Sequence, residues 1–132
     1  MSGTKGFDSL PLRSELLSRL DAMGFNIMTP VQAETLPTML IGRDVIAQAN
    51  TGSGKTAAFG LACLQPLNPK AFHVQSLILC PTRELAEQVA QSLRDLAREI
   101  GNTKILTICG GKPLGPQFAS LERSAHIIVG TP

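Results

Sequence analysis

Apolar and polar residues alternate at helical spacing along the first third of the chain. Between residues 12 and 23, leucines at positions 12, 16, 17 and 20 fall on one helical face, with charged residues between them, and Gly24 supplies a stop. Thr29-Pro30-Val31-Gln32 then opens a second helix, because Thr caps a helix well, Pro suits its first turn and Gln completes a capping box. The pattern therefore predicts two consecutive helices, the second ending near Gly42.

From Asp44 onward, short apolar runs alternate with helical patterns. The predicted strands cover residues 45–47, 76–80, 104–109 and 127–129, and the predicted helices begin at about Lys55, span 83–100 and precede Ser124. Strands that alternate with helices indicate a parallel sheet. Several of these strands are apolar throughout, which predicts an α/β fold with helices on both faces of the sheet.

Length and composition are typical of one ordinary domain. The 132 residues are 43% hydrophobic and 17% charged, which favours a globule over a disordered segment. The net charge is +2, with no run of Lys or Arg that would mark a nucleic-acid surface by charge alone.

The cysteines and the N-terminus exclude several classes of protein. Cys63, Cys80 and Cys109 lie far apart in apolar stretches without a C-x-x-C spacing, so buried reduced thiols are expected rather than disulfides or zinc ligands. Residues 1–6 are polar, and no signal peptide or membrane span follows them. We therefore expect a cytoplasmic protein with no membrane partner.

The strongest chemical signal is a phosphate-binding loop between a predicted strand and a predicted helix. It reads Ala49-Asn50-Thr51-Gly52-Ser53-Gly54-Lys55-Thr56 and matches G-x-x-x-x-G-K-[ST], with Ala49 in place of the first Gly. Glycines let backbone N–H groups converge on phosphate oxygens, Lys55 would reach the β- and γ-phosphates, and the Thr56 hydroxyl would ligate Mg²⁺. The alternative is a glycine-rich turn that binds nothing.

Ala49 and four other segments resemble the DEAD-box RNA helicases. Gly24-Phe25 with residues 29–32 resembles the family's Q motif, which here spans about 7–32 and includes the isolated aromatic Phe7. Pro81-Thr82-Arg83-Glu84-Leu85-Ala86 is similar to motif Ia, Gly110-Gly111 to the GG motif, and Thr131-Pro132 to the start of motif Ib, T-P-G-R. The resemblance covers essentially all 132 residues and implies part of the first RecA-like P-loop NTPase domain. Residues 51–61, 78–89 and 104–107 most resemble the bacterial DbpA group.

The Q-motif resemblance implies that Gln32 selects ATP. A Gln amide donates to adenine N7 and accepts from N6 at once, although Gln32 would also serve as a helix-capping residue alone. Thr29 belongs to the same motif, and Phe7 or Phe25 would add stacking on the base, although an isolated Phe is usually part of a core.

The other motifs imply contacts with RNA sugars and phosphates. The expected RNA-binding residues are Pro81, Thr82, Arg83, Gly110, Gly111, Thr131 and Pro132, with ribosomal RNA implied by the DbpA resemblance. Alternatively, Thr82 is only an N-cap, Arg83 and Glu84 are a solvated pair, and the two glycines make a turn.

The sequence lacks the acidic pair that the resemblance ties to hydrolysis. No Asp-Glu dipeptide occurs, and the D-E-A-D and S-A-T motifs and the second lobe with its arginine finger are absent. We therefore expect a truncated RecA-like lobe in which Lys55 and Thr56 become catalytic only with further sequence. The alternative is a non-catalytic nucleotide-binding module or an inactive product. The resemblance also implies that the strand before the phosphate-binding loop lacks a neighbouring strand, so we expect these residues alone to be marginally stable.

Overall fold

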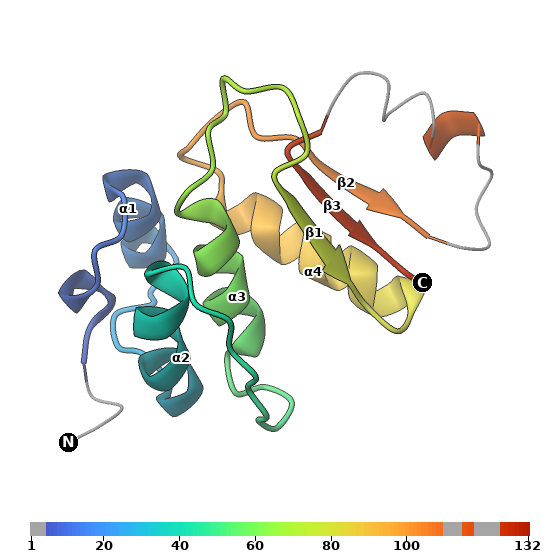
Figure 1. Ribbon diagram of the computed structural model, residues 1–132. Helices are drawn as coiled ribbons and strands as arrows, with labels where there is room; N and C mark the ends of the chain where they lie inside the picture. The colour runs from blue at the N-terminus through green and yellow to red at the C-terminus, as the bar shows by residue number, and fades with distance from the viewer. Residues whose placement is uncertain (1–4, 110–114, 118–124) are drawn as a thin grey trace. The chain divides into compact units, whose positions relative to one another are not determined.

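The helices and strands fall into two compact units. The computed structural model describes residues 5–109, 115–117 and 125–132, and the chain divides into Met1–Pro66 and Leu67–Pro132, which are described separately below. The first unit contains η1 (Phe7–Ser9), α1 (Ser14–Ala22), α2 (Pro30–Leu40) and α3 (Lys55–Leu64). The second contains β1 (Ser76–Leu79), α4 (Arg83–Leu96), β2 (Ile105–Ile108) and β3 (Ile127–Gly130), as Figure 1 shows.

Both predicted N-terminal helices are present. In α1, Leu16 and Leu20 are completely buried, and Leu12 is buried just before the helix. The helix begins two residues later than expected because Arg13 is extended, and Gly24 follows its end at a φ of 79°. Helical spacing of leucines therefore identified the buried face of α1 correctly.

The start of α2 has the predicted capping box. Thr29 Oγ1 accepts from the Gln32 backbone N–H at 3.5 Å, and Gln32 Oε1 accepts from the Thr29 N–H at 2.9 Å. Pro30 occupies the first turn, where its missing N–H costs nothing. Two N–H groups that would otherwise lack partners are thus satisfied within four residues.

The strand predicted for residues 45–47 is wrong for this chain. This segment is neither helix nor strand, and the Ile46 side chain is fully exposed, at 102% of its reference area. An apolar run becomes a buried strand only when neighbouring strands pair with it, and no described residue forms a ladder with this one. The run has the composition of a central strand without the pairing that would make it one.

α3 begins at Lys55, within the phosphate-binding motif, and packs against α2. Gly54 is its N-cap, and Leu61 and Leu64 are completely buried. At its other end, Arg13 Nη1 donates to the Leu64 carbonyl at 3.4 Å, and the Arg13 N–H donates to Gln65 Oε1 at 2.7 Å. The chain before α1 therefore anchors the C-terminal end of the helix whose N-terminus faces the loop.

The second unit contains a parallel three-stranded sheet in the order β1-β3-β2. Leu79 pairs with Gly130, which pairs with Ile108, so the carboxyl ends of all three strands lie at one edge. α4 packs against β2 and β3, and Ile127 and Val129 are fully buried. This confirms the parallel α/β arrangement expected from the alternating pattern.

Two details of this unit differ from expectation. α4 ends at Leu96 rather than at residue 100, because the chain turns at Ala97 and then enters a loop in which Gly101 and Asn102 have positive φ. Leu77 and Leu79 on β1 remain 64% and 62% exposed, so the helical cover expected on a second sheet face is not seen at these residues. The short helix expected before Ser124 falls largely outside the described residues.

Candidate functional site

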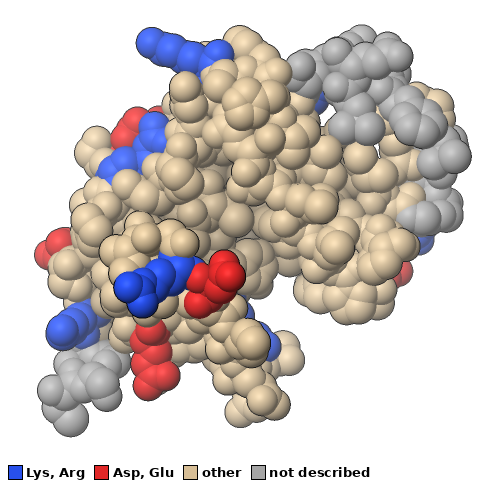
Figure 2. All heavy atoms as spheres, viewed as in Figure 1, with Lys and Arg blue, Asp and Glu red and all other residues tan. Residues whose placement is uncertain are grey.

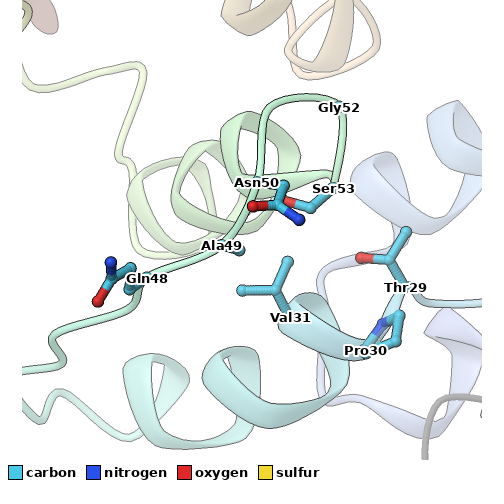
Figure 3. Close-up of a pocket in the computed structure, with 8 residues that line it drawn as sticks. All are labelled: Thr29, Pro30, Val31, Gln48, Ala49, Asn50, Gly52 and Ser53. Atoms are coloured by element: carbon cyan, nitrogen blue, oxygen red, sulfur yellow. The ribbon is translucent and has the colours of Figure 1, made fainter.

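A cleft in the first unit brings the start of α2 opposite the glycine-rich loop. Its volume is about 650 Å³, within the range of small-molecule sites. Figure 3 shows the loop passing across the first turn of α2, with Val31 pointing toward it. The lining residues are Thr29, Pro30, Val31, Gln48, Ala49, Asn50, Gly52 and Ser53.

Five of these lining residues were expected from motifs, and three were missed. Thr29, Ala49, Asn50, Gly52 and Ser53 belong to the predicted nucleotide-binding set, whereas Pro30, Val31 and Gln48 do not. A signal existed for all three, because each is adjacent in sequence to a predicted residue. Thr51, Gly54, Lys55 and Thr56 complete the loop without lining the cleft.

The loop depends on two glycines with left-handed backbone. Gly52 has φ of 82° and Gly54 has φ of 91°, a region that other residues rarely adopt. A Cβ on Gly54 would also lie 2.5 Å from Gln32 Nε2 and 2.9 Å from Thr29 Oγ1. Glycine at position 54 therefore suits the left-handed backbone and leaves room for the side chains of Gln32 and Thr29.

The N-terminus of α3 offers donors for an anion. No side chain among the described residues caps this helix, and its dipole places partial positive charge at the loop. The Ser53 hydroxyl is buried and has no hydrogen-bond partner among the described residues. A buried polar group without a partner is costly, so these groups fit the phosphate oxygens of a nucleotide.

The two residues expected to act on the phosphates lie at the first turn of this helix. Lys55 Nζ donates to the Ala49 carbonyl across the loop, so the ammonium group is held within it. Thr56 follows on α3 and is half-buried. A phosphate entering the loop would offer Lys55 a charged acceptor in place of a neutral carbonyl, which is a stronger interaction.

Gln32 connects the capping box to the loop. Its side chain is 5% exposed, and Nε2 donates to the Gly54 carbonyl at 3.0 Å while Oε1 accepts from Thr29. The capping role is therefore observed. An amide has a second N–H and a second acceptor lone pair, so contact with a base remains chemically open and stays a prediction.

The two candidate stacking residues lie away from the cleft lining. Phe7 is 3% exposed and belongs to the core beside α1. Phe25 is 44% exposed, and neither ring lines the cleft. The core interpretation fits Phe7, and stacking on a base by either ring stays a prediction.

The predicted RNA contacts lie at the carboxyl edge of the sheet in the second unit. Pro81, Thr82 and Arg83 follow β1 and are exposed. The half-buried Thr131 follows β3, and its N–H donates to the Ile108 carbonyl at 3.2 Å. Parallel pairing thus brings motif Ia and the start of motif Ib to one edge, which includes the exposed Pro132. Gly110 and Gly111 lie outside the described residues.

Charge does not single out this edge. On the face that Figure 2 shows, basic and acidic side chains are scattered and intermixed. Arg83 and Glu84 are both exposed at the start of α4. Any contact with a polyanion at the edge therefore depends on individual donors, such as the Arg83 guanidinium and the N–H groups at the start of α4.

Thr82 is the N-cap of α4, which is the structural alternative to RNA contact for this residue. Its Oγ1 accepts from the Leu85 N–H at 3.2 Å and caps α4. We expect Thr82→Ala to lower the free energy of unfolding by about 1 kcal/mol, because one N–H at the helix start loses its partner. Thr82→Ser keeps the acceptor and should retain the wild-type value in urea unfolding. Equal stability of the Ala and Ser variants would contradict this role.

Two of the three cysteines are buried. Cys80 and Cys109 are buried free thiols, as expected, whereas Cys63 is only half-buried. Burial raises the pKa of the Cys80 thiol, and the neighbouring Cys109 adds to this effect, so Cys80 stays protonated at neutral pH. Across the described residues, no cluster of His, Cys, Asp and Glu is arranged for a metal ion, and no helix has the length and apolarity to span a membrane.

A family profile and several known proteins are similar to this chain in sequence. The sequence profile of the DEAD/DEAH box helicase family matches residues 29–132. The chain is 60% identical over 116 residues to ATP-dependent RNA helicase DbpA of Escherichia coli K12, covering 88% of this chain and 25% of that protein. It is 43% identical over 126 residues to DEAD-box ATP-dependent RNA helicase CshA of Bacillus subtilis, covering 96% of this chain and 25% of that protein. The chain therefore spans about a quarter of the length of these relatives.

Solved structures give the same fold. A DEAD box protein from the hyperthermophile Methanococcus jannaschii aligns with a TM-score of 0.89 at 39% identity, over 96% of this chain and 34% of that chain. Dbp5 of Saccharomyces cerevisiae, bound to RNA and ADP BeF3, aligns with a TM-score of 0.85 at 35% identity, over 97% of this chain and 32% of that chain. These neighbours are RecA-like helicase domains, and this chain corresponds to part of one.

Proposed function

The chain belongs to the DEAD/DEAH box helicase family, and from that premise we propose that its first unit binds ATP with Mg²⁺ and its second unit contacts the RNA backbone. In a longer protein these units would serve ATP-dependent remodelling of RNA. DbpA and CshA, which share 60% and 43% identity with it, are named ATP-dependent RNA helicases.

One observation carries the nucleotide proposal. The buried Ser53 hydroxyl without a partner lies beside the uncapped N-terminus of α3, in a loop that lines the cleft. A turn that only joined two elements would be expected to satisfy its own buried polar groups. These groups are instead suited to donate hydrogen bonds to phosphate oxygens, with Lys55 as the cation.

Different residues of the loop would bind the phosphates and hold the metal ion. Lys55 would move from the Ala49 carbonyl to the β- and γ-phosphates, and the Thr56 hydroxyl would hold Mg²⁺. The metal would supply positive charge to the same phosphates. Gln32 would present its remaining N–H and lone pair to adenine.

The 132 residues are proposed to bind nucleotide without hydrolysing it. No Asp-Glu pair is present to hold the metal and to orient water. The RNA contact would involve sugars and phosphates through Pro81, Thr82, Arg83, Thr131 and Pro132, and would be largely independent of base sequence. The resemblance to the DbpA group makes ribosomal RNA the first substrate to test and ribosome assembly the first process.

We expect the chain to bind Mg-ATP about tenfold or more tightly than Mg-GTP, because an amide contact with two base atoms contributes about 1–3 kcal/mol of discrimination. Calorimetric titration with each nucleotide measures this preference. Gln32→Ala should abolish it. Binding of neither nucleotide would refute the proposal.

A matched variant separates base recognition from helix capping. Thr29→Ala removes the acceptor for the Gln32 N–H but leaves the Gln32 amide in place. It should lower stability by about 1 kcal/mol while keeping the preference for ATP. If Thr29→Ala and Gln32→Ala lose the preference equally, Gln32 acts only through the cap.

A further inference from the structure

The edge of the sheet where all three parallel strands begin, called the amino edge below, carries an exposed aromatic ring that belongs to none of the motifs described above. Phe72 lies in the loop before β1 and is 69% exposed, although burying such a ring would stabilise the fold by about 1.5–3 kcal/mol. The carboxyl edge, with Thr82 and Thr131, is at the other end of the strands. This loop is therefore separate from the RNA contact proposed above.

Hydrogen bonds of the Asn68 and Gln75 side chains cross-link the loop. Gln75 Oε1 accepts from the Asn68 N–H at 2.9 Å, and Gln75 Nε2 donates to the carbonyls of Asn68 and Ala71 at 2.8 and 3.1 Å. The Lys70 N–H donates to Asn68 Oδ1 at 3.0 Å. Phe72 is consequently exposed on a loop that is cross-linked by its own hydrogen bonds.

His126 supports the ring from inside the sheet edge. The imidazole is 2% exposed, and its Nδ1 accepts from the Lys104 N–H at 2.9 Å. Its Nε2 therefore carries the hydrogen and donates to the Pro69 carbonyl at 3.0 Å. The Phe72 ring lies against this imidazole with 5.8 Å between centroids at a 44° tilt. The imidazole therefore packs against one side of the Phe72 ring and leaves most of the ring exposed.

The surroundings of the ring are basic. The loops before β1 and β2 meet at this edge, as Figure 1 shows and as the bonds of His126 to Lys104 and Pro69 require. The loop before β1, residues 67–75, contains Lys70 and no Asp or Glu, and the loop between α4 and β2, residues 97–104, contains Arg98, Glu99 and Lys104. The two loops together carry more cationic than anionic side chains, which favours the approach of a polyanion to this edge.

We propose that this edge is a second contact for single-stranded RNA, with a base stacked on Phe72 and the backbone phosphates near Lys70 and Lys104. Stacking on an exposed ring beside cations is how proteins bind single strands with little sequence preference. The proposal rests on the proposed function in that RNA is the ligand. It adds a contact with bases, whereas the carboxyl edge contacts sugars and phosphates.

The test is binding of a fluorescein-labelled, unstructured single-stranded RNA to the full chain, followed by polarisation. The chain has no Trp or Tyr, so the label must be on the RNA. We expect Phe72→Ala to weaken binding about tenfold and Phe72→Trp to retain it, because the stacked face is lost in one variant and kept in the other. Lys70→Gln should reduce the slope of log affinity against log salt by about 0.7.

Val74→Ala is the matched control, because Val74 is also apolar and exposed, at 45%, on the same loop. It should bind RNA like the wild type, and thermal unfolding should show all variants folded. Unchanged RNA binding by Phe72→Ala would overturn the inference and would leave the loop as a candidate surface for a protein partner. Equal weakening by Val74→Ala would also overturn it, because apolar area rather than stacking would then be responsible.

The inference and the proposed function fail in different ways. If Arg83→Gln weakens binding while Phe72→Ala does not, RNA contact at the carboxyl edge stands and the second contact falls. If both variants weaken binding, both contacts are supported. If the wild-type chain binds no RNA, both RNA contacts are refuted, and the separate titration with Mg-ATP still decides the nucleotide proposal.

Discussion

Replacing Lys55 with methionine is expected to weaken Mg-ATP binding by about 10- to 100-fold. Methionine keeps an unbranched side chain of similar length and removes only the ammonium group. A hydrogen bond to a charged partner contributes about 1.5–3 kcal/mol, which corresponds to this range in affinity. Calorimetric titration of the folded variant measures the loss directly.

The structure offers a control for the loss of charge itself. Lys70 is an exposed lysine outside the loop, so Lys70→Met changes the net charge equally without touching the cleft. It should bind Mg-ATP as the wild type does. Equal weakening by the two variants would mean that overall charge attracts the nucleotide, and Lys55 would lose its assigned role.

Stability of the Lys55 variant needs its own measurement, because Lys55 bonds to the Ala49 carbonyl in the loop. This acceptor is on a loop, where water can replace the lysine. We therefore expect little change in unfolding by urea, so that the loss of affinity is not a loss of fold.

Features set by neighbouring residues could be predicted from the sequence. The capping box of α2 needs only Thr29 and Gln32, and both of its bonds are present. The glycine-rich loop likewise follows from its own residues, since Gly52 and Gly54 alone permit its positive φ angles. Parallel pairing of β1, β3 and β2 followed from strands that alternate with helical patterns.

Features set by distant residues could not be predicted in this way. Residues 45–47 have the composition of a buried strand, yet strand formation depends on partners elsewhere, and Ile46 is exposed. The approach of Pro30 and Val31 to the loop depends on how α2 packs on α3, which a motif does not encode. The same holds for the contact of the Phe72 ring with His126, which joins residues far apart in the sequence.

Gly54 is where local and distant constraints meet, and Gly54→Ala is expected to have the largest effect on the fold of the first unit. The left-handed φ of 91° costs a residue with a Cβ about 1–2 kcal/mol, and the new methyl group would lie 2.5 Å from Gln32 Nε2. We expect a loss of about 2–4 kcal/mol in the free energy of unfolding and no measurable Mg-ATP binding. Urea unfolding and titration check the two effects.

Gly52→Ala separates the two causes, because Gly52 has a φ of 82° but no atom of the described residues lies within 4 Å of its added Cβ. In this control, the free energy of unfolding should fall only by the cost of the left-handed backbone, about 1–2 kcal/mol. Removing the obstructing amide gives a second check: in a Gln32→Ala background, Gly54→Ala should cost no more than Gly52→Ala does, since only the backbone strain remains. If Gly54→Ala costs the same with and without Gln32, the approach of α2 to the loop does not constrain this glycine, and the requirement for glycine at this position is a matter of backbone conformation alone.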